Sequence, residues 1–221
     1  MSTGLIHLER DIIDCVRCPR LRDHCLQVAQ VKRRAYLDHE YWGRPVPGFG
    51  DPHGRLFVLG LAPGAHGANR TGRVFTGDRS GEWLFRALHQ AGFANQPAST
   101  HRGDGLALSD CWVSASVRCA PPDNKPDPAE VLSCRPWLAQ ELALMPQIRV
   151  VVALGRLAFD NYLRLQGLPP SRFSFAHNQA HDAGITLISS YHPSQQNTST
   201  GKLTEPMLRA VFDHAREILQ S

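Results

Sequence analysis

The run Val150-Val151-Val152-Ala153-Leu154 is the feature that most limits what this chain can fold into. An uninterrupted apolar, β-branched run of this length is typical of a strand that is buried on both faces. Similar patterns predict strands over Leu56–Leu59, Cys111–Val117 and Ile185–Ser189. Strands that are buried on both faces need helices on both sides, so the pattern favours a mostly parallel sheet inside an α/β protein.

Helical patterns separate these runs. Ser80 is a candidate cap for a helix over Gly81–Ala91, and Asp127-Pro128-Ala129-Glu130 is a capping sequence for a second helix that reaches about Leu144. Further helices are predicted from Leu5 toward Cys15, from Gly155 to Gln166, and from Thr204 to the end of the chain. The 221 residues suit one domain over residues 1–221.

Two polar motifs follow predicted strands, at the sheet edge where α/β proteins bind their ligands. The first is Gly60-Leu61-Ala62-Pro63-Gly64, which leads to Phe75-Thr76-Gly77-Asp78, and the second is Tyr191-His192-Pro193-Ser194. Together they supply an aromatic ring, a carboxylate and an imidazole. This set predicts a site that holds a flipped nucleobase and breaks its bond to the sugar.

The six cysteines suggest a metal or redox site before disulfides. Cys15 and Cys18 form a Cys-x-x-Cys pair, and Cys119 and Cys134 form a second, wider pair. Four thiolates suit either zinc or an iron–sulfur cluster, and spacing alone does not choose between them. The alternative is that these are ordinary buried cysteines. Cys25 and Cys111 are predicted to be core thiols.

Charge and hydropathy leave the partner open. The net charge of +4 permits a polyanionic partner without demanding one. The chain has no run of 18 apolar residues, so no membrane span is expected. Its N-terminus is too charged for a signal peptide, which predicts a bacterial-type cytoplasmic location. A monomer is the simplest expectation.

With these motifs, the chain resembles family 5, or type B, of the uracil-DNA glycosylase superfamily. The resemblance extends from Cys15 to the last predicted helix. It is carried by the four cysteines and by the ordered segments Gly60–Gly72, Phe75–Asp78, Val117–Pro122 and Tyr191–Ser194.

The resemblance implies a three-layer α/β/α sandwich and a 4Fe–4S cluster held by Cys15, Cys18, Cys119 and Cys134. It also implies an enzyme that removes uracil and other deaminated bases, such as hypoxanthine and xanthine, from DNA and leaves an abasic site. Two positions depart from most of the superfamily. Leu61 stands where a polar, water-activating side chain is usual, and Ala115 stands where strict uracil enzymes have an asparagine. Both departures are expected of family 5 and predict looser base selection.

The roles predicted for the motif residues follow from the chemistry. Phe75 is the candidate plate under the flipped base; its alternative is a core phenylalanine, and the flanking Gly72 and Gly77 favour an exposed ring on a loop. Gly60 and Asn124 are the other base-binding candidates. His192 is the predicted donor to the departing base. Asp78 is the predicted carboxylate that steers the attacking water, and its alternative is a simple helix cap. For Asn124 the alternative is a turn residue in a proline-rich loop.

DNA contacts are predicted from polar and basic residues around these motifs. The flexible segment 194–202 is expected to enter the minor groove, or else to be a solvated connection. The candidate contacts there are Ser194, Gln195, Asn197 and Lys202. The candidate phosphate contacts are Arg33, Arg34, Arg70, Arg73, Arg79 and Lys202.

Three functions compete at this point. The first is a monofunctional DNA glycosylase in base excision repair, because no lysine is obviously placed to attack the sugar. The second is a non-catalytic iron–sulfur or zinc protein that binds nucleic acid. The third is an electron carrier. Only the first needs both Asp78 and His192.

Overall fold

Six strands form one sheet in the order β1-β3-β2-β4-β6-β5. This computed structural model describes residues 3–221; Met1 and Ser2, which the one-domain prediction for residues 1–221 includes, lie outside the described part. The central strands β3 (Cys111–Ala115), β2 (Leu56–Gly60), β4 (Val150–Leu154) and β6 (Thr186–Ser190) are parallel. The edge strands β1 (Phe49–Gly50) and β5 (Gln179–Asp182) pair antiparallel. The predicted mostly parallel sheet is confirmed.

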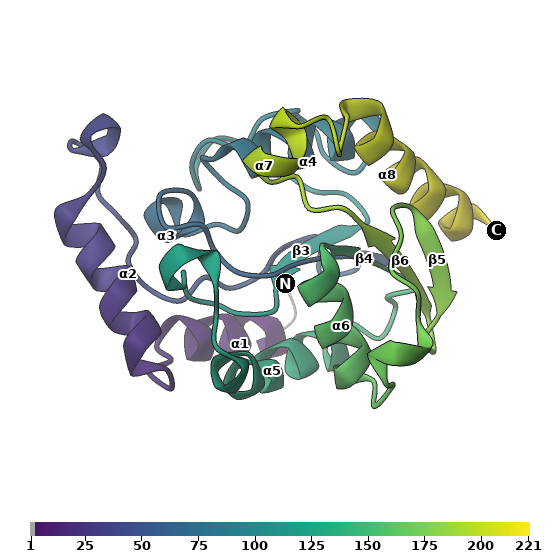
Figure 1. Cartoon of the computed structure of the whole chain (residues 1–221), viewed down its shortest axis with the longest axis horizontal. Helices are drawn as coiled ribbons and strands as arrows, with labels where there is room; N and C mark the ends of the chain where they lie inside the picture. Colours follow the sequence, from purple (N-terminus) through teal and green to yellow (C-terminus); the bar gives the residue numbers. More distant parts are fainter. Residues whose placement is uncertain (1–2) are drawn as a thin grey trace.

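Helices cover both faces of the sheet, as the ribbon in Figure 1 shows. The helices α4 (Arg79–Gln90) and α8 (Glu205–Gln220) pack on one face. The helices α1 (Thr3–Ile13), α5 (Pro128–Ala143) and α6 (Arg156–Leu165) cover the other. The three-layer α/β/α sandwich is therefore confirmed.

The apolar strand runs are continuous because each strand feeds two cores. Leu56 and Val58 of β2 pack with α4 and α8, whereas Phe57 and Leu59 pack with α5 and α6. Successive side chains of a strand point to opposite faces of the sheet, so both sets must be apolar. All four side chains are fully buried.

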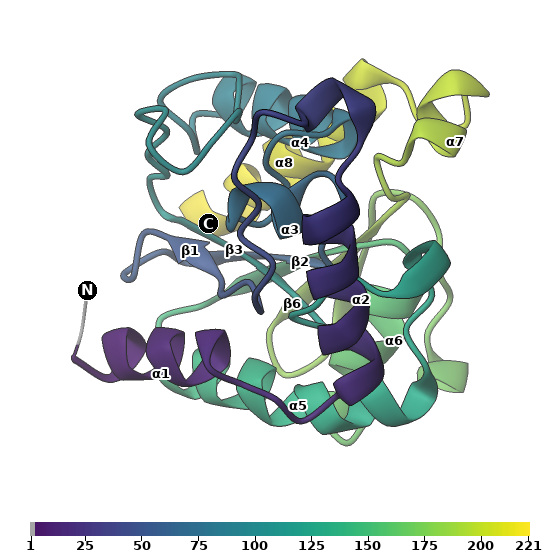
Figure 2. The same ribbon diagram turned by 90° about the vertical axis from the view of Figure 1, so that its left-hand side faces the viewer.

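One helix stands outside the two helical layers. The helix α2 (Pro19–Val31) runs upright across one side of the sandwich in Figure 2, and the 3₁₀ turn η1 (Arg34–Tyr36) follows it. The sequence pattern did not predict α2, because its apolar face is narrow: only Leu21 and Cys25 are buried. It packs against a third, small core that also contains Cys119 and Cys134.

The connections contain short helices that the sequence did not reveal. The segment 194–202, expected to be flexible, contains α7 (Gln195–Ser199), because the Ser194 hydroxyl caps it by accepting a hydrogen bond from the Asn197 N–H at 3.3 Å. Asp78, and not Ser80, is the N-cap of α4. The other short elements are α3 (Ala68–Thr71), η2 (Pro122–Asn124) and η3 (Pro170–Arg172). Within residues 3–221, no helix is both long enough and apolar enough to cross a bilayer.

Candidate active site

A cavity of about 490 Å³ lies beyond the carboxyl ends of β2 and β6. Its wall brings together six of the predicted site residues, although they come from three separate stretches of the chain. These residues are Phe75, Asp78, Asn124, His192, Ser194 and Gln195. The sheet topology explains why these residues meet, because the carboxyl ends of parallel strands lie at the same edge of a sheet.

Asp78 is both a helix cap and a wall residue of the cavity. Its Oδ1 accepts a hydrogen bond from the Gly81 N–H at 3.0 Å, which closes the first turn of α4. Its Oδ2 lies against two glycines of the first motif. A Cβ at Gly64 would stand 2.9 Å from this oxygen, and a Cβ at Gly67 would overlap it. The glycines therefore leave the carboxylate the room that it occupies.

The electrostatics of Asp78 pull in opposite directions. Burial raises the pKa of this carboxyl group above its ordinary value, while the backbone N–H groups of Gly81 and Ser80 and the charge of Arg70 act against the rise. The effect of burial is the larger, so this carboxylate is more basic than one in water. Asp78 thus has the properties of a general base.

Phe75 stands in an unusual backbone conformation beside the cavity. Its φ is +52°, which is uncommon for a side-chain-bearing residue and is often found at functional sites. The ring packs directly on Gly60, where a Cβ would stand 2.7 Å from two ring atoms. Gly60 does not line the cavity; it is the floor under the ring. The Phe75 and His192 rings lie 5.9 Å apart, tilted by 33°.

His192 extends from the loop after β6. Burial lowers the pKa of its imidazole to about 4, so the ring is neutral at pH 7. Among residues 3–221, neither ring nitrogen has a protein hydrogen-bond partner. A neutral imidazole still carries one N–H. His192 lines the cavity, and no acceptor among the described residues uses this N–H.

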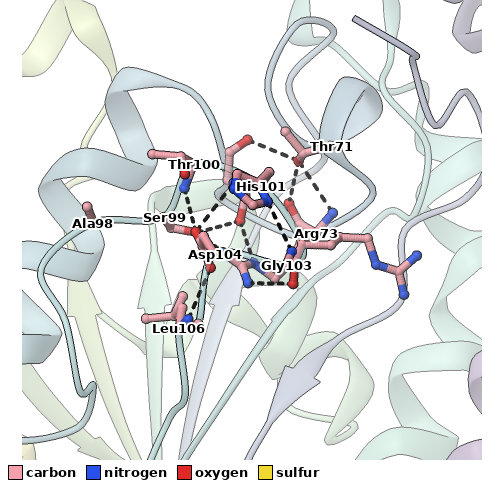
Figure 3. Close-up of polar contacts among 12 residues, drawn as sticks. Thr71, Arg73, Ala98, Ser99, Thr100, His101, Gly103, Asp104 and Leu106 are labelled. Atoms are coloured by element: carbon pink, nitrogen blue, oxygen red, sulfur yellow. Dashed lines mark hydrogen bonds and ion pairs between the residues drawn. The ribbon is translucent and has the colours of Figure 1, made fainter.

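Two of the predicted DNA-contact arginines are parts of the scaffold. Arg73 donates to the Ser99 hydroxyl and to the Asp104 carboxylate, both at 2.7 Å, in a pair whose side chains are only 7% and 6% exposed (Figure 3). Although Asp104 is desolvated, its bond with Arg73 helps to hold the pKa of that carboxyl at about 2. Arg70 donates to the carbonyls of His66 and Gly77 at 2.7 and 2.8 Å. Because both guanidinium groups are used internally, we withdraw the phosphate-contact prediction for Arg70 and Arg73.

The α7 segment divides its predicted contacts. Ser194 and Gln195 line the cavity. The amide of Asn197 instead donates to the His192 carbonyl at 2.9 Å, so it braces the loop that carries the imidazole. The ammonium of Lys202 lies 5.0 Å from the centre of the Tyr191 ring, and this exposed residue is not part of the cavity wall.

The two positions that depart from the superfamily pattern carry apolar side chains, and only Leu61 of the two lines the cavity. Leu61 lines the cavity and brings no group that can activate water. Ala115 is buried at the end of β3, opposite Gly60, and brings no side-chain amide. Asn124, at the end of η2 with a φ of +56°, is exposed and is the amide that does line the cavity.

Sequence reasoning missed part of the wall. His66 and Tyr36 both line the cavity, together with Arg33, which was predicted only as one of several phosphate contacts. His66 lies in the segment Gly60–Gly72 that carries the family resemblance, two residues after Gly64, and this position was the available signal. Tyr36 follows α2, a helix that the pattern did not reveal.

The four cysteines of the two predicted pairs line one small cavity beside α2. Arg17, Arg22 and Arg118 line it with them. The Arg118 N–H donates to Cys134 Sγ at 3.3 Å, and Cys25 lies nearby, its Sγ donating to the Ala120 carbonyl at 3.6 Å. No group of three His, Cys, Asp or Glu side chains in the described part of the chain is placed to hold a single metal ion.

Comparison with known proteins agrees with this geometry. The sequence model of the Uracil DNA glycosylase superfamily matches residues 47–216. A type-5 uracil-DNA glycosylase of Mycobacterium tuberculosis is 52% identical over 208 residues, which are 92% of this chain and 78% of that protein. The type-5 enzyme of Mycobacterium leprae is 50% identical over 96% of this chain and 94% of its own. That of Thermus thermophilus is 48% identical over 92% and 93%.

The resemblance first seen in the motifs is thus confirmed, and it covers most of the chain. The match includes both sheet-edge motifs, all of the central parallel strands and the residues that line the cavity, except Arg33 and Tyr36. The chain belongs to the uracil DNA glycosylase superfamily, a group of hydrolases that cleave N-glycosidic bonds.

Proposed function

We propose that this protein is a monofunctional DNA glycosylase of base excision repair, which hydrolyses the glycosidic bond of uracil and of other deaminated bases. The observation that carries the proposal is the shared cavity of Asp78, His192 and Phe75. Its volume of about 490 Å³ is in the usual range for small-ligand sites. The named type-5 relatives support uracil as a substrate.

Base extraction is the first step. A base inside a duplex is out of reach, so it must be flipped out at a cost of a few kcal/mol, which is lowest for a mispaired base. Stacking on the Phe75 ring returns about 1–3 kcal/mol of this cost. Ser194 and Gln195 line the cavity at the start of α7, which supports them as DNA contacts, and we keep Lys202 as a proposed phosphate contact outside the cavity.

Bond cleavage separates opposite charges. The base leaves with negative charge on its oxygen, and the neutral His192 donates its N–H there. The sugar becomes electron-poor, and the Asp78 carboxylate balances it while accepting a proton from the attacking water. No lysine lines the cavity among the described residues, so the reaction stops at the abasic site.

Base selection follows from two apolar positions. Leu61 in the cavity wall and Ala115, buried at the end of β3 outside that wall, offer no side-chain hydrogen bond that would reject a purine analogue or a differently substituted pyrimidine. Asn124 is the amide left to read the base edge. We therefore expect hypoxanthine and xanthine to be removed as well as uracil.

Cys15, Cys18, Cys119 and Cys134 fit a 4Fe–4S cluster. Four thiols from three segments converge on one cavity, with arginines to balance an anionic cluster and a backbone N–H directed at one sulfur. When bound, the cluster would supply four metal–thiolate bonds that tie the N-terminal segment to the loop after β3 and to α5. Reduced thiolates suit the cytoplasmic location that we propose, and we keep the monomer as the simplest state.

The test of the proposal compares the parent protein with Asp78→Asn on duplexes that contain uracil, hypoxanthine or xanthine, followed by alkaline cleavage. Asparagine caps a helix as well as aspartate does, so α4 stays intact while the general base, the Asp78 carboxylate, is removed. The expected result is strand cleavage by the parent on all three duplexes, and a loss of turnover of at least about 100-fold in the variant.

Two outcomes would contradict the proposal. Binding of damaged DNA without any abasic sites would favour a non-catalytic iron–sulfur or zinc protein. Full activity of Asp78→Asn, with unchanged DNA affinity, would show that Asp78 is not the general base. The visible spectrum and iron content of the purified protein separate an iron–sulfur cluster from zinc.

A further inference from the structure

His66 forms a part of the cavity wall that the proposed reaction does not use. It lies in the turn between β2 and α3, and its Nδ1 is 3.0 Å from the hydroxyl of Tyr41. Tyr41 is only 8% exposed, so this hydroxyl is held in the interior. The imidazole is thus fixed from behind while the residue faces the cavity.

The hydrogen bonds decide which His66 nitrogen carries the proton. The Arg33 backbone N–H donates to the Tyr41 oxygen at 3.4 Å, and His66 Nδ1 is the one acceptor that this hydroxyl has within residues 3–221. Tyr41 therefore gives its proton to Nδ1. In a neutral imidazole the proton then resides on Nε2, which becomes a donor.

The surroundings of this donor are cationic. Burial lowers the pKa of His66, and Arg33, Arg70 and His24 lower it further, so the ring is neutral at pH 7. The Arg33 side chain is exposed, lines the same cavity, and has no protein partner in the described part of the chain. Tyr36 completes this wall, with its ring 4.0 Å from the Arg70 guanidinium carbon.

We propose that Arg33 and His66 form a phosphate-binding subsite, which holds a phosphodiester next to the flipped nucleotide. A free guanidinium and a neutral N–H suit the anionic oxygens of a phosphodiester, and a backbone phosphate accompanies every flipped base. This subsite lies on the α2 side of the cavity, away from the α7 segment that follows His192, as Figure 1 shows for the two segments. The inference rests on the proposed function, because it takes DNA as the ligand.

The test measures binding without turnover. Fluorescence anisotropy is recorded for a duplex that carries a tetrahydrofuran abasic analogue, over a series of salt concentrations. Arg33→Gln and His66→Phe should each weaken binding by about tenfold at low salt. Arg33→Gln should also lower the slope of log Kd against log salt by about 1, since one cation no longer neutralises a phosphate. Tyr41→Phe keeps the ring and removes the proton that fixes the tautomer, so it should give a smaller loss.

Arg164→Gln is the matched control. Arg164 on α6 is exposed, lies outside the cavity wall and is not among the candidate DNA contacts, so its loss should leave affinity and salt slope close to those of the parent. Thermal melting of each variant separates a lost contact from a lost fold.

Neutral methylphosphonates identify the contact. Replacing the correct phosphate beside the abasic analogue should weaken parent binding by about tenfold and should make Arg33→Gln and the parent bind equally well. The proposal is overturned if Arg33→Gln and His66→Phe lose the same affinity on every methylphosphonate duplex as on the natural one, or if they lose no more than Arg164→Gln. Absence of abasic sites with the parent protein would instead overturn the glycosylase proposal, and it would leave this binding comparison readable.

Discussion

Adding one methyl group at Gly60 should misplace the aromatic plate of the site. The Cβ of Gly60→Ala would stand 2.7 Å from two atoms of the Phe75 ring, whereas carbon atoms in contact settle at about 3.5–4.0 Å. The ring must therefore move by roughly 1 Å. Phe75 is 8% exposed and held at a φ of +52°, so it has little freedom to absorb the shift elsewhere. A displacement of about 1 Å at a positioning residue can cost about 100-fold in rate.

Single-turnover cleavage of a uracil duplex and urea denaturation together measure this effect. Gly60→Ala should lower kcat/KM by about 100-fold and stability by about 1–3 kcal/mol. Combining it with Phe75→Leu should restore much of the stability and none of the activity. Gly103→Ala is the control, because its new Cβ would have no neighbour closer than 3.7 Å. An active Gly60→Ala enzyme, or an unimpaired Phe75→Leu enzyme, would refute the role of the ring.

Three further outcomes are expected. The pKa of His192 is near its ordinary 6.5 in the unfolded chain and about 4 in the folded protein. Between these pH values the unfolded state binds more protons than the folded state. The free energy of unfolding therefore falls as the pH drops through this window. His192→Asn should remove up to about 3 kcal/mol of that fall, measured by urea denaturation at pH 4 and 7. Glu141→Ala should cost about 3–5 kcal/mol in the same assay, because it leaves the guanidinium of Arg118 buried without its carboxylate. Cys134→Ser should deplete the iron of the purified protein, whereas Cys111→Ala should retain it.

Strong apolar periodicity explains why most of the fold was predictable. Strands β2, β4 and β6 and helices α4, α5, α6 and α8 lie within a few residues of their predicted bounds. The edge strand β5 was missed because its residues alternate between half-buried and exposed positions and carry polar side chains. The helix α2 was missed because its packing depends on contacts distant in sequence, such as that of Cys25 with the Ala120 carbonyl.

Local sequence predicted which residues meet at the site better than what each of them does there. Residue type alone made Arg73 a phosphate contact, but its partner Asp104 lies in a loop that no motif connects with it. Asn197 was predicted from its polar segment to contact DNA, whereas in the fold its amide donates to the His192 carbonyl. His66 was missed for the converse reason, since its position in the cavity wall and its bond to Tyr41 come from the tertiary fold.

The position of Asp78 shows how the chain tolerates a leucine where its superfamily usually has a polar residue. Leu61 follows β2 directly and leaves the strand end without a side chain that can act as a general base. The carboxylate comes instead from the N-terminus of α4, where helix N–H groups bind one oxygen and two glycines of the same β2 motif make room for the other. Those glycines are required by Asp78 whether or not it is the base, so the motif and the carboxylate depend on each other. If Asp78 is the general base, as we propose, Leu61 is free to face the flipped nucleobase, which links the position of this carboxylate to the broad base selection that we propose.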